Sequence, residues 1–312
     1  MTPLPPATAK ASAQWAFDAY QQVRASLPIA RFSAQSGHAP DLTALIGHFD
    51  VFLLDAFGVL NIGERAIPGA IAHVAALQAA GCHVMVVSNA AGYPKRFLMA
   101  RLARLGCAFA PQEVLSSREV LLDALHHAPS RRWGLMAEAR YGLEELERLD
   151  ARILGDDPAD YDAAQGFALL GSGSWTEARQ SLLAKSLARN PRPVLVGNPD
   201  IVAPREGGLS LEPGHFAHRL ADLAGVAPRF FGKPYPAIFD MALARVRAAR
   251  PDVTDAARIL MVGDTLHTDI LGGAAAGLKT ALITGHGALA GLDAARAIAA
   301  AEIVPDLILP TT

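Results

Sequence analysis

Several polar residues of this chain stand directly after short apolar runs, or in a tight loop before a predicted helix. They bring together carboxylates, a hydroxyl beside an amide, and a single ammonium group. In proteins with an open parallel sheet, ligands bind in a crevice beyond the carboxyl ends of the strands. Residues that directly follow such strands can therefore meet in one crevice. The residues are Asp55, Ser88, Asn89, Lys233, Asp264 and Asp269.

Each of these residues has a structural explanation when taken alone. Asp55 can cap a turn, Ser88 or Asp269 can cap a helix, and Lys233 can be a solvated surface lysine. Taken together, the carboxylates would repel each other in one crevice, so one must hold a proton or a cation must lie among them. Oxygen ligands alone, at a site of phosphate chemistry, favour Mg²⁺.

The elements that would position these residues follow the pattern of an α/β protein. Continuous apolar runs indicate strands that are covered on both faces, as in a parallel sheet. Amphipathic segments between the runs, often opened by proline and closed by glycine, indicate helices. We therefore predict a Rossmann-like, doubly wound parallel sheet. The runs are 51–54, 83–88, 113–117, 259–263 and 280–284.

The middle of the chain predicts a second, smaller α/β domain inserted into the first. Residues 131–213 contain their own apolar runs, a predicted helix from Gly142 to Leu149 and another from Thr176 to Arg189. The sheet pattern resumes afterwards, so the core is expected to comprise residues 46–130 and 214–312. Residues 1–45 form a lead-in with one helix, predicted from Ala11 to Leu27, that packs against the core.

Composition narrows the class of protein. The 312 residues are 51% apolar and 19% charged, with a formal net charge of −2. These values predict a folded chain without general attraction to nucleic acid or to an anionic membrane. Two cysteines cannot form a disulfide framework, and the start of the chain lacks a secretion signal. We expect a cytoplasmic protein.

The polar stretches also resemble, in order and spacing, the motifs of the haloacid dehalogenase superfamily. Residues 54–60 (LDAFGVL) resemble motif I, and Ser88-Asn89 is similar to motif II. Gly232-Lys233-Pro234 resembles motif III, and residues 263–269 (GDTLHTD) match motif IV. The insert lies between the second and third motifs, as in the class IIA, NagD-like sugar phosphatases.

The resemblance implies roles for individual residues. Asp55 would be the nucleophile that becomes a phosphoaspartate. Mg²⁺ would be held by the Asp55 carboxylate, the backbone carbonyl of Phe57 and Asp264, while Asp269 would orient a metal-bound water or support the ligands.

The remaining motif residues would bind the substrate. Ser88 and the Asn89 amide would bind phosphoryl oxygens, and Lys233 would neutralise charge on Asp55 and on the transferred group. Asn198 and Asp200 in the insert are candidate substrate contacts. A plain loop turn at Asn-Pro-Asp explains these residues equally well.

One position departs from the phosphatase pattern. Phosphatases of the superfamily usually carry a second aspartate, the general acid and base, where this chain has Phe57. A backbone carbonyl there can still bind metal, but proton transfer must come from elsewhere, and slow turnover or an activated leaving group is expected. His267 and His286 follow predicted strand ends, but structural roles are favoured for both.

The expected function is therefore Mg²⁺-dependent hydrolysis of a small phosphomonoester. Phe57 keeps two alternatives open: a metal-independent, dehalogenase-like hydrolase that uses Asp55, and a phosphate-ligand binding protein with vestigial catalysis. The Asp264 and Asp269 pair and the place of the insert argue against the dehalogenase. The partner would be a small phosphorylated metabolite, and a homodimer is expected by analogy.

Overall fold

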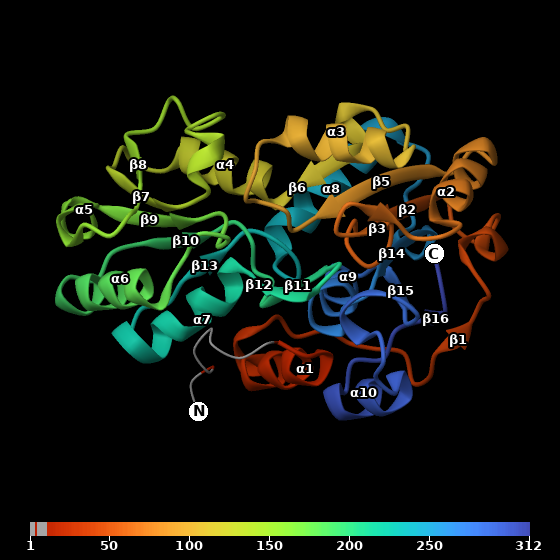
Figure 1. Ribbon diagram of the computed structural model, residues 1–312. Coiled ribbons are helices and arrows are strands. Elements are labelled where there is room, and N and C mark those ends of the chain that lie inside the picture. Colours follow the sequence, from red (N-terminus) through yellow and green to blue (C-terminus); the bar gives the residue numbers. More distant parts are fainter. Residues whose placement is uncertain (1–3, 5–10) are drawn as a thin grey trace.

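The computed structural model describes residue 4 and residues 11–312. Its centre is a parallel sheet of seven strands in the order β1-β16-β15-β14-β2-β5-β6, as predicted for a doubly wound α/β domain (Figure 1). The strands are β1 (Gly37–His38), β2 (Val51–Leu54), β5 (His83–Ser88), β6 (Val114–Ser116), β14 (Ile259–Gly263), β15 (Lys279–Ile283) and β16 (Leu307–Leu309).

Alternate side chains of the central strands serve two separate hydrophobic cores, which explains their continuous apolar sequence. In β2, Val51 and Leu53 pack toward one face, where α4 and α8 lie. Phe52 and Leu54 pack toward the other face, against α2 and α3. The helices are α2 (Ala70–Ala79), α3 (Lys95–Leu105), α4 (Ser117–His127) and α8 (Pro236–Ala249), with the short α9 (Leu271–Ala275) and α10 (Ala294–Ala301) near the C-terminus.

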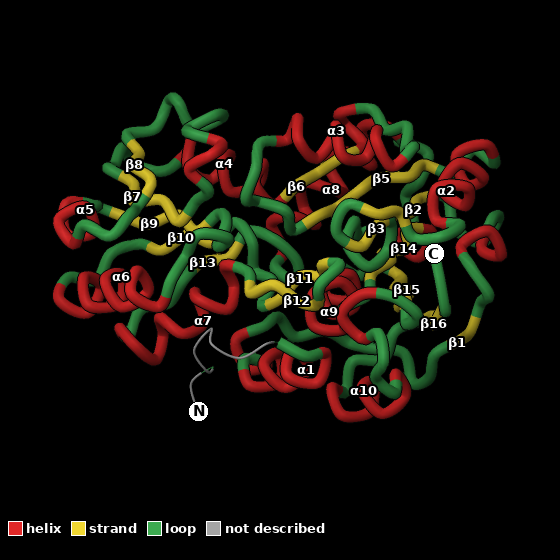
Figure 2. Tube along the Cα trace, in the orientation of Figure 1, coloured by secondary structure: helices red, strands yellow, loops and turns green. Residues whose placement is uncertain are grey.

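The insert forms a second parallel sheet of five strands in the order β13-β10-β9-β7-β8. Figure 2 shows its strands as a group separate from those of the core. We call this unit the cap. Its elements are β7 (Trp133–Met136), β8 (Ala151–Ile153), α5 (Pro158–Ala163), β9 (Gly166–Leu169), α6 (Glu177–Arg189), β10 (Val194–Val196), α7 (Pro213–Ala224) and β13 (Arg229–Phe230).

The cap continues beyond residue 213, where the sequence pattern placed its end. Phe216 and Leu220 of α7 lie in the same hydrophobic cluster as Leu183 of α6. Farther along, β13 pairs in parallel with β10. Two small antiparallel hairpins were also not predicted: β3 (Asn61–Ile62) with β4 (Arg65–Ala66), and β11 (Val202–Arg205) with β12 (Gly208–Leu211). Their strands are too short to give a clear alternating pattern.

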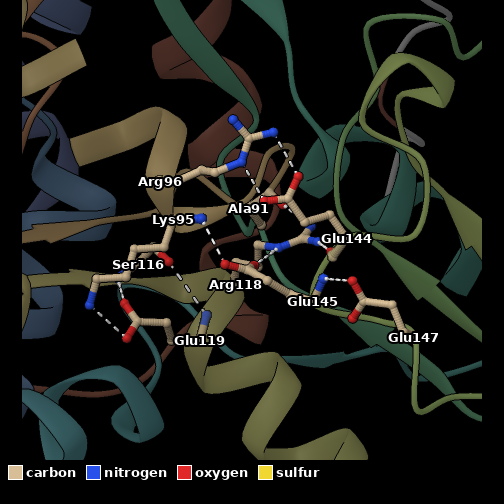
Figure 3. Close-up of polar contacts among 9 residues, drawn as sticks. All are labelled: Ala91, Lys95, Arg96, Ser116, Arg118, Glu119, Glu144, Glu145 and Glu147. Atoms are coloured by element: carbon tan, nitrogen blue, oxygen red, sulfur yellow. Dashed lines mark hydrogen bonds and ion pairs between the residues drawn. The ribbon is translucent and has the colours of Figure 1, made fainter. Parts of the chain in front are cut away.

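The helix predicted from Gly142 to Leu149 is wrong, because this segment consists of turns. Gly142 and Glu145 have left-handed backbone angles (φ +56° and +67°), which interrupt a right-handed helix. The segment is fastened to the core instead (Figure 3). Glu145 accepts from the buried Arg118 guanidinium of α4 at 2.6 Å and from the Lys95 backbone N–H at the start of α3.

The lead-in contributes both a helix and a strand. The helix α1 (Ala13–Gln22) is shorter than the predicted Ala11–Leu27, and a 3₁₀ turn at Arg24–Ser26 follows it. The strand β1 then extends the core sheet beside β16. The described part of this lead-in therefore completes one edge of the core as well as packing against it. Of the first ten residues of the chain, all but Leu4 lie outside the described residues.

Candidate active site

Three polar groups meet at one edge of the core sheet because their strands are parallel neighbours. Asp55 follows β2, which pairs with β14 on one side and with β5 on the other. Asp264 follows β14, and Ser88 ends β5. The Asp55 backbone N–H donates to Val262 at 2.9 Å, so the ladder holds the chain up to the carboxylate.

Three carboxylates gather here around one buried lysine. Asp55, Asp264 and Asp269 each offer an oxygen within 4.8 Å of the others. The Lys233 ammonium lies 2.7 Å from Asp55 Oδ1 and 2.7 Å from Asp269 Oδ1, and its side chain is only 1% exposed. The loop before α8 thus delivers the only ammonium that the described part of the chain pairs with these carboxylates.

The electrostatics of this cluster indicate a shortage of positive charge. Burial, with the charges of Asp269 and Asp55, raises the pKa of Asp264 well above its ordinary value. Burial also raises the pKa of Asp269 to about 6, although the Lys233 ammonium opposes the shift. A single ammonium does not compensate three carboxylates, whereas a divalent cation among them would.

The surroundings of Asp264 fit a small cation with oxygen ligands. Its Oδ2 accepts the Ala288 backbone N–H at 2.6 Å, and its Oδ1 accepts the Thr265 hydroxyl at 3.1 Å. Gly58 and Gly287 pass close by with left-handed backbone angles (φ +83° and +81°). A Cβ on them would lie 2.2 Å and 1.9 Å from Asp264 Oδ2. The cluster of carboxylate oxygens is the donor set that Mg²⁺ takes in proteins.

Gly58→Ala should displace Asp264 and remove activity. The added Cβ would overlap its carboxylate, and alanine is strained at this backbone angle. Gly81→Ala is the matched control, because Gly81 has the same φ of +83° but nothing within 4 Å of its Cβ position. We expect both variants to lose thermal stability through backbone strain, Gly58→Ala more than Gly81→Ala because of the overlap, and loss of the expected phosphate release for Gly58→Ala alone. Equal activity in the two variants would contradict the assigned role of Asp264.

Asn89 fastens the site together through its side chain. Its Oδ1 accepts the Lys233 backbone N–H at 2.7 Å, and its Nδ2 donates to the Lys233 carbonyl at 2.9 Å and to Asp200 Oδ1 at 2.8 Å. The side-chain amide is therefore engaged with protein groups. The Ser88 hydroxyl accepts the Ala90 N–H at 3.3 Å, and Ser88 lines a cavity between core and cap.

The two residues suggested from the Asn-Pro-Asp stretch lie at this cavity, next to the core site. Asn198 donates to Glu212 at 3.1 Å and accepts the Asp200 backbone N–H at 2.9 Å. That second bond closes an Asx-type turn at the Asn-Pro-Asp stretch, where a turn was one of the two interpretations. Both residues also line the cavity, and contact with a substrate stays a prediction.

The cavity itself has a volume of about 660 Å³ and lies between core and cap. Asp55, Ser88 and Asp264 contribute from the core, and Ser172 and Arg140 from the cap. Lys233 and Asp269 lie behind this wall, since neither is among its described lining residues. The volume falls in the usual range for small-molecule sites.

Comparison with known proteins agrees with this geometry. A family model described as haloacid dehalogenase-like hydrolase matches residues 52–151, and an HAD-hydrolase-like model matches residues 230–310. Chronophin of Bos taurus is 30% identical over 275 residues, which cover 85% of this chain and 91% of that protein. The chain belongs to the haloacid dehalogenase-like hydrolases.

Further relatives place it among the phosphatases of this superfamily, in class IIA. The acid sugar phosphatase of Staphylococcus aureus is 26% identical over 74% of this chain and 85% of its own length. The crystal structure of a possible sugar phosphatase from Cytophaga hutchinsonii shares the fold, with a TM-score of 0.76, 24% identity, and coverage of 88% of this chain and 98% of that one. The chain is thus a phosphatase of the haloacid dehalogenase type.

Phe57, the departure from the usual phosphatase motif, is held between charged groups. Its ring centre lies 5.3 Å from the Arg101 guanidinium and 5.0 Å from that of Arg205. These arginines pair with Glu64 at 2.7 Å and with Glu212 at 2.9 Å. All five residues line the cavity. The two ion pairs could not be predicted from the sequence, because Glu64 and Arg101 are far apart in the chain and Arg205 lies on an unpredicted hairpin.

The two histidines considered from the sequence are not among the described residues that line the cavity. His267 is 1% exposed and faces α1. Burial lowers its pKa to about 3, so the ring is neutral at ordinary pH. The structural explanation favoured for this residue agrees with its position.

Within the part of the chain that the structure describes, no helix combines the length and apolarity needed to cross a bilayer.

Proposed function

We propose that this phosphatase hydrolyses small phosphomonoesters through a phosphoaspartate at Asp55, with Mg²⁺ bound at the carboxylate cluster. The observation that carries the proposal is the meeting of Asp55, Asp264 and Asp269 around Lys233 at the wall of a cavity. Asp55, Asp264 and the Phe57 carbonyl would hold the cation, which supplies charge stabilisation for the transferred phosphoryl group when bound.

The residues of the chain perform the other parts of the reaction. The Lys233 ammonium orients the Asp55 carboxylate at 2.7 Å, leaving its second oxygen to attack phosphorus as the bond to the leaving oxygen breaks. The leaving oxygen takes its proton from solvent. Water then attacks the phosphorus of the acyl phosphate, the bond between phosphorus and the Asp55 oxygen breaks, and inorganic phosphate leaves with the Asp55 carboxylate regenerated. Ser88 and the adjacent backbone hold phosphoryl oxygens during both steps. Asp269, bonded to Lys233 and to the Thr265 N–H, keeps these groups in register.

The cavity is suited to a polar leaving group. Arginine and glutamate side chains from core and cap both line it, and hydroxyl groups can donate to the carboxylates and accept from the guanidinium groups. Sugar phosphates are therefore the first substrates to test. The decisive experiment is a phosphate-release screen over sugar phosphates, nucleotides and other phosphomonoesters with MgCl₂ present, in which turnover of none would contradict the proposal.

Chelation separates this mechanism from the metal-independent alternative. EDTA should abolish phosphate release, and excess MgCl₂ should restore it, because without a cation the three carboxylates repel the anionic substrate. The measurement is the initial rate on the best substrate of the screen. The control is enzyme from which the EDTA has been dialysed and to which MgCl₂ has been returned. A rate that EDTA leaves unchanged would exclude the metal mechanism and show that Asp55 releases phosphate without a bound cation.

A further inference from the structure

The helix α1 lies outside both regions that match the family models, yet it is packed against the active-site loop. It lies beside the core near α9 and α10 (Figure 1). Ala16, Ala19 and Tyr20 form its buried face. They belong to the same hydrophobic cluster as Leu266, which precedes His267 in the loop between Asp264 and Asp269, and Ile270, which directly follows Asp269.

His267 is the residue of this loop that α1 holds most closely. Its ring stacks on Tyr20, with centres 5.2 Å apart and planes 9° apart, and meets the Phe17 ring edge-on at 5.7 Å. Gln21 Oε1 lies 2.6 Å from His267 Nε2. Because Gln21 Nε2 donates to the Ala300 carbonyl of α10 at 2.8 Å, its oxygen is the acceptor and His267 Nε2 carries the proton.

The same helix also contacts the loop between β10 and β11. The Tyr20 hydroxyl accepts the backbone N–H of Ile201 at 3.1 Å, one residue beyond Asp200. Tyr20 is 4% exposed and Ile201 is fully buried. One aromatic side chain thus contacts the loop of Asp264 and Asp269 through its ring, and the cavity-lining loop of Asn198 and Asp200 through its hydroxyl.

We propose that Tyr20 and Gln21 are positioning residues for the metal site. The loop that carries Asp264 and Asp269 makes a single π-helical turn at Leu266–Ile270, and His267 is part of this turn. Fixing the His267 ring against α1, whose Gln21 is itself bonded to α10, fixes the backbone of the turn and therefore the direction of the nearby carboxylates. The inference deepens the proposed function and rests on its requirement for Mg²⁺. Groups outside the ligand shell commonly change metal affinity 10- to 100-fold by such orientation.

The test is Mg²⁺ binding to the full chain by calorimetry, with MgCl₂ as the only ligand. Gln21→Leu keeps the side-chain bulk and removes the bonds to His267 and to the Ala300 carbonyl, and we expect its dissociation constant for Mg²⁺ to rise by about tenfold. Gln14→Ala is the matched control on the same helix, because Gln14 is exposed and contacts Asp18 alone among the described hydrogen bonds. It should bind Mg²⁺ as the wild type does.

The outcomes distinguish this inference from the proposed function. If the wild-type chain binds no Mg²⁺, the metal mechanism fails and the inference fails with it. If the wild type binds Mg²⁺ and a folded Gln21→Leu binds it equally well, only the inference fails. Tyr20→Phe provides a second variant that keeps the ring on His267. It should retain Mg²⁺ affinity while raising KM, because it removes only the acceptor for the Ile201 N–H, and an unchanged KM would overturn the role given to that hydroxyl.

Discussion

Asp55→Asn should reduce phosphate release on the order of 10⁴-fold or more, because the amide cannot attack phosphorus as the carboxylate does. The change is nearly isosteric and leaves an oxygen for Lys233, which lies 2.7 Å from Asp55 Oδ1. The fold should therefore survive. Removing one of three neighbouring carboxylates also relieves repulsion, so we expect thermal stability equal to or above that of the wild type.

The measurement compares initial rates and thermal unfolding of Asp55→Asn, wild type and Asp222→Asn, whose aspartate is exposed on α7. Asp222→Asn should match the wild type in both. Mass spectrometry of acid-quenched wild type during turnover should detect a phosphorylated chain that Asp55→Asn lacks. Full activity in folded Asp55→Asn would contradict the covalent mechanism. The nucleophile of the phosphatase reaction would then have to be a group other than the Asp55 carboxylate.

The sequence was a good guide to the core because its signals there are local. Continuous apolar runs such as Val51–Leu54 are typical of strands that are covered on both faces, and the structure shows both faces packed. A polar residue that directly follows such a run must then lie at the carboxyl edge of the sheet. The meeting of Asp55 and Asp264 follows from these two facts and from the pairing of β2 with β14.

The features that the sequence did not predict depend on contacts between distant segments. The turns at 142–149 look helical in composition, but the buried Arg118, more than twenty residues earlier, binds Glu145 and the Glu144 carbonyl. The extension of the cap to β13 depends on a two-residue strand whose pattern carries no periodicity. The contact of α1 with His267 joins residues 246 positions apart. Tertiary packing decides all three cases.

Phe57→Asp should raise turnover most for substrates whose leaving group needs a proton. The new carboxyl group would stand where related phosphatases carry their general acid and base, a function typically worth ~10²–10⁴-fold. The Arg101 and Arg205 guanidinium groups beside the present ring would favour the charged form of this carboxyl, which weakens it as an acid. We therefore expect a gain of about 10²-fold, the lower end of that range, on an alkyl phosphate.

The ratio of the turnover rates on two substrates tests this prediction specifically. p-Nitrophenyl phosphate has a leaving group that departs without a proton, so Phe57→Asp should change its rate little while the rate on glycerol phosphate rises. Phe57→Leu is the matched control, because it removes the ring from between the two arginines without supplying an acid. If leucine and aspartate give the same ratio, the ring limits turnover by occupying space. If only aspartate changes the ratio, the missing proton donor is what slows the wild-type reaction, and Phe57 is the residue that sets its preference for activated leaving groups.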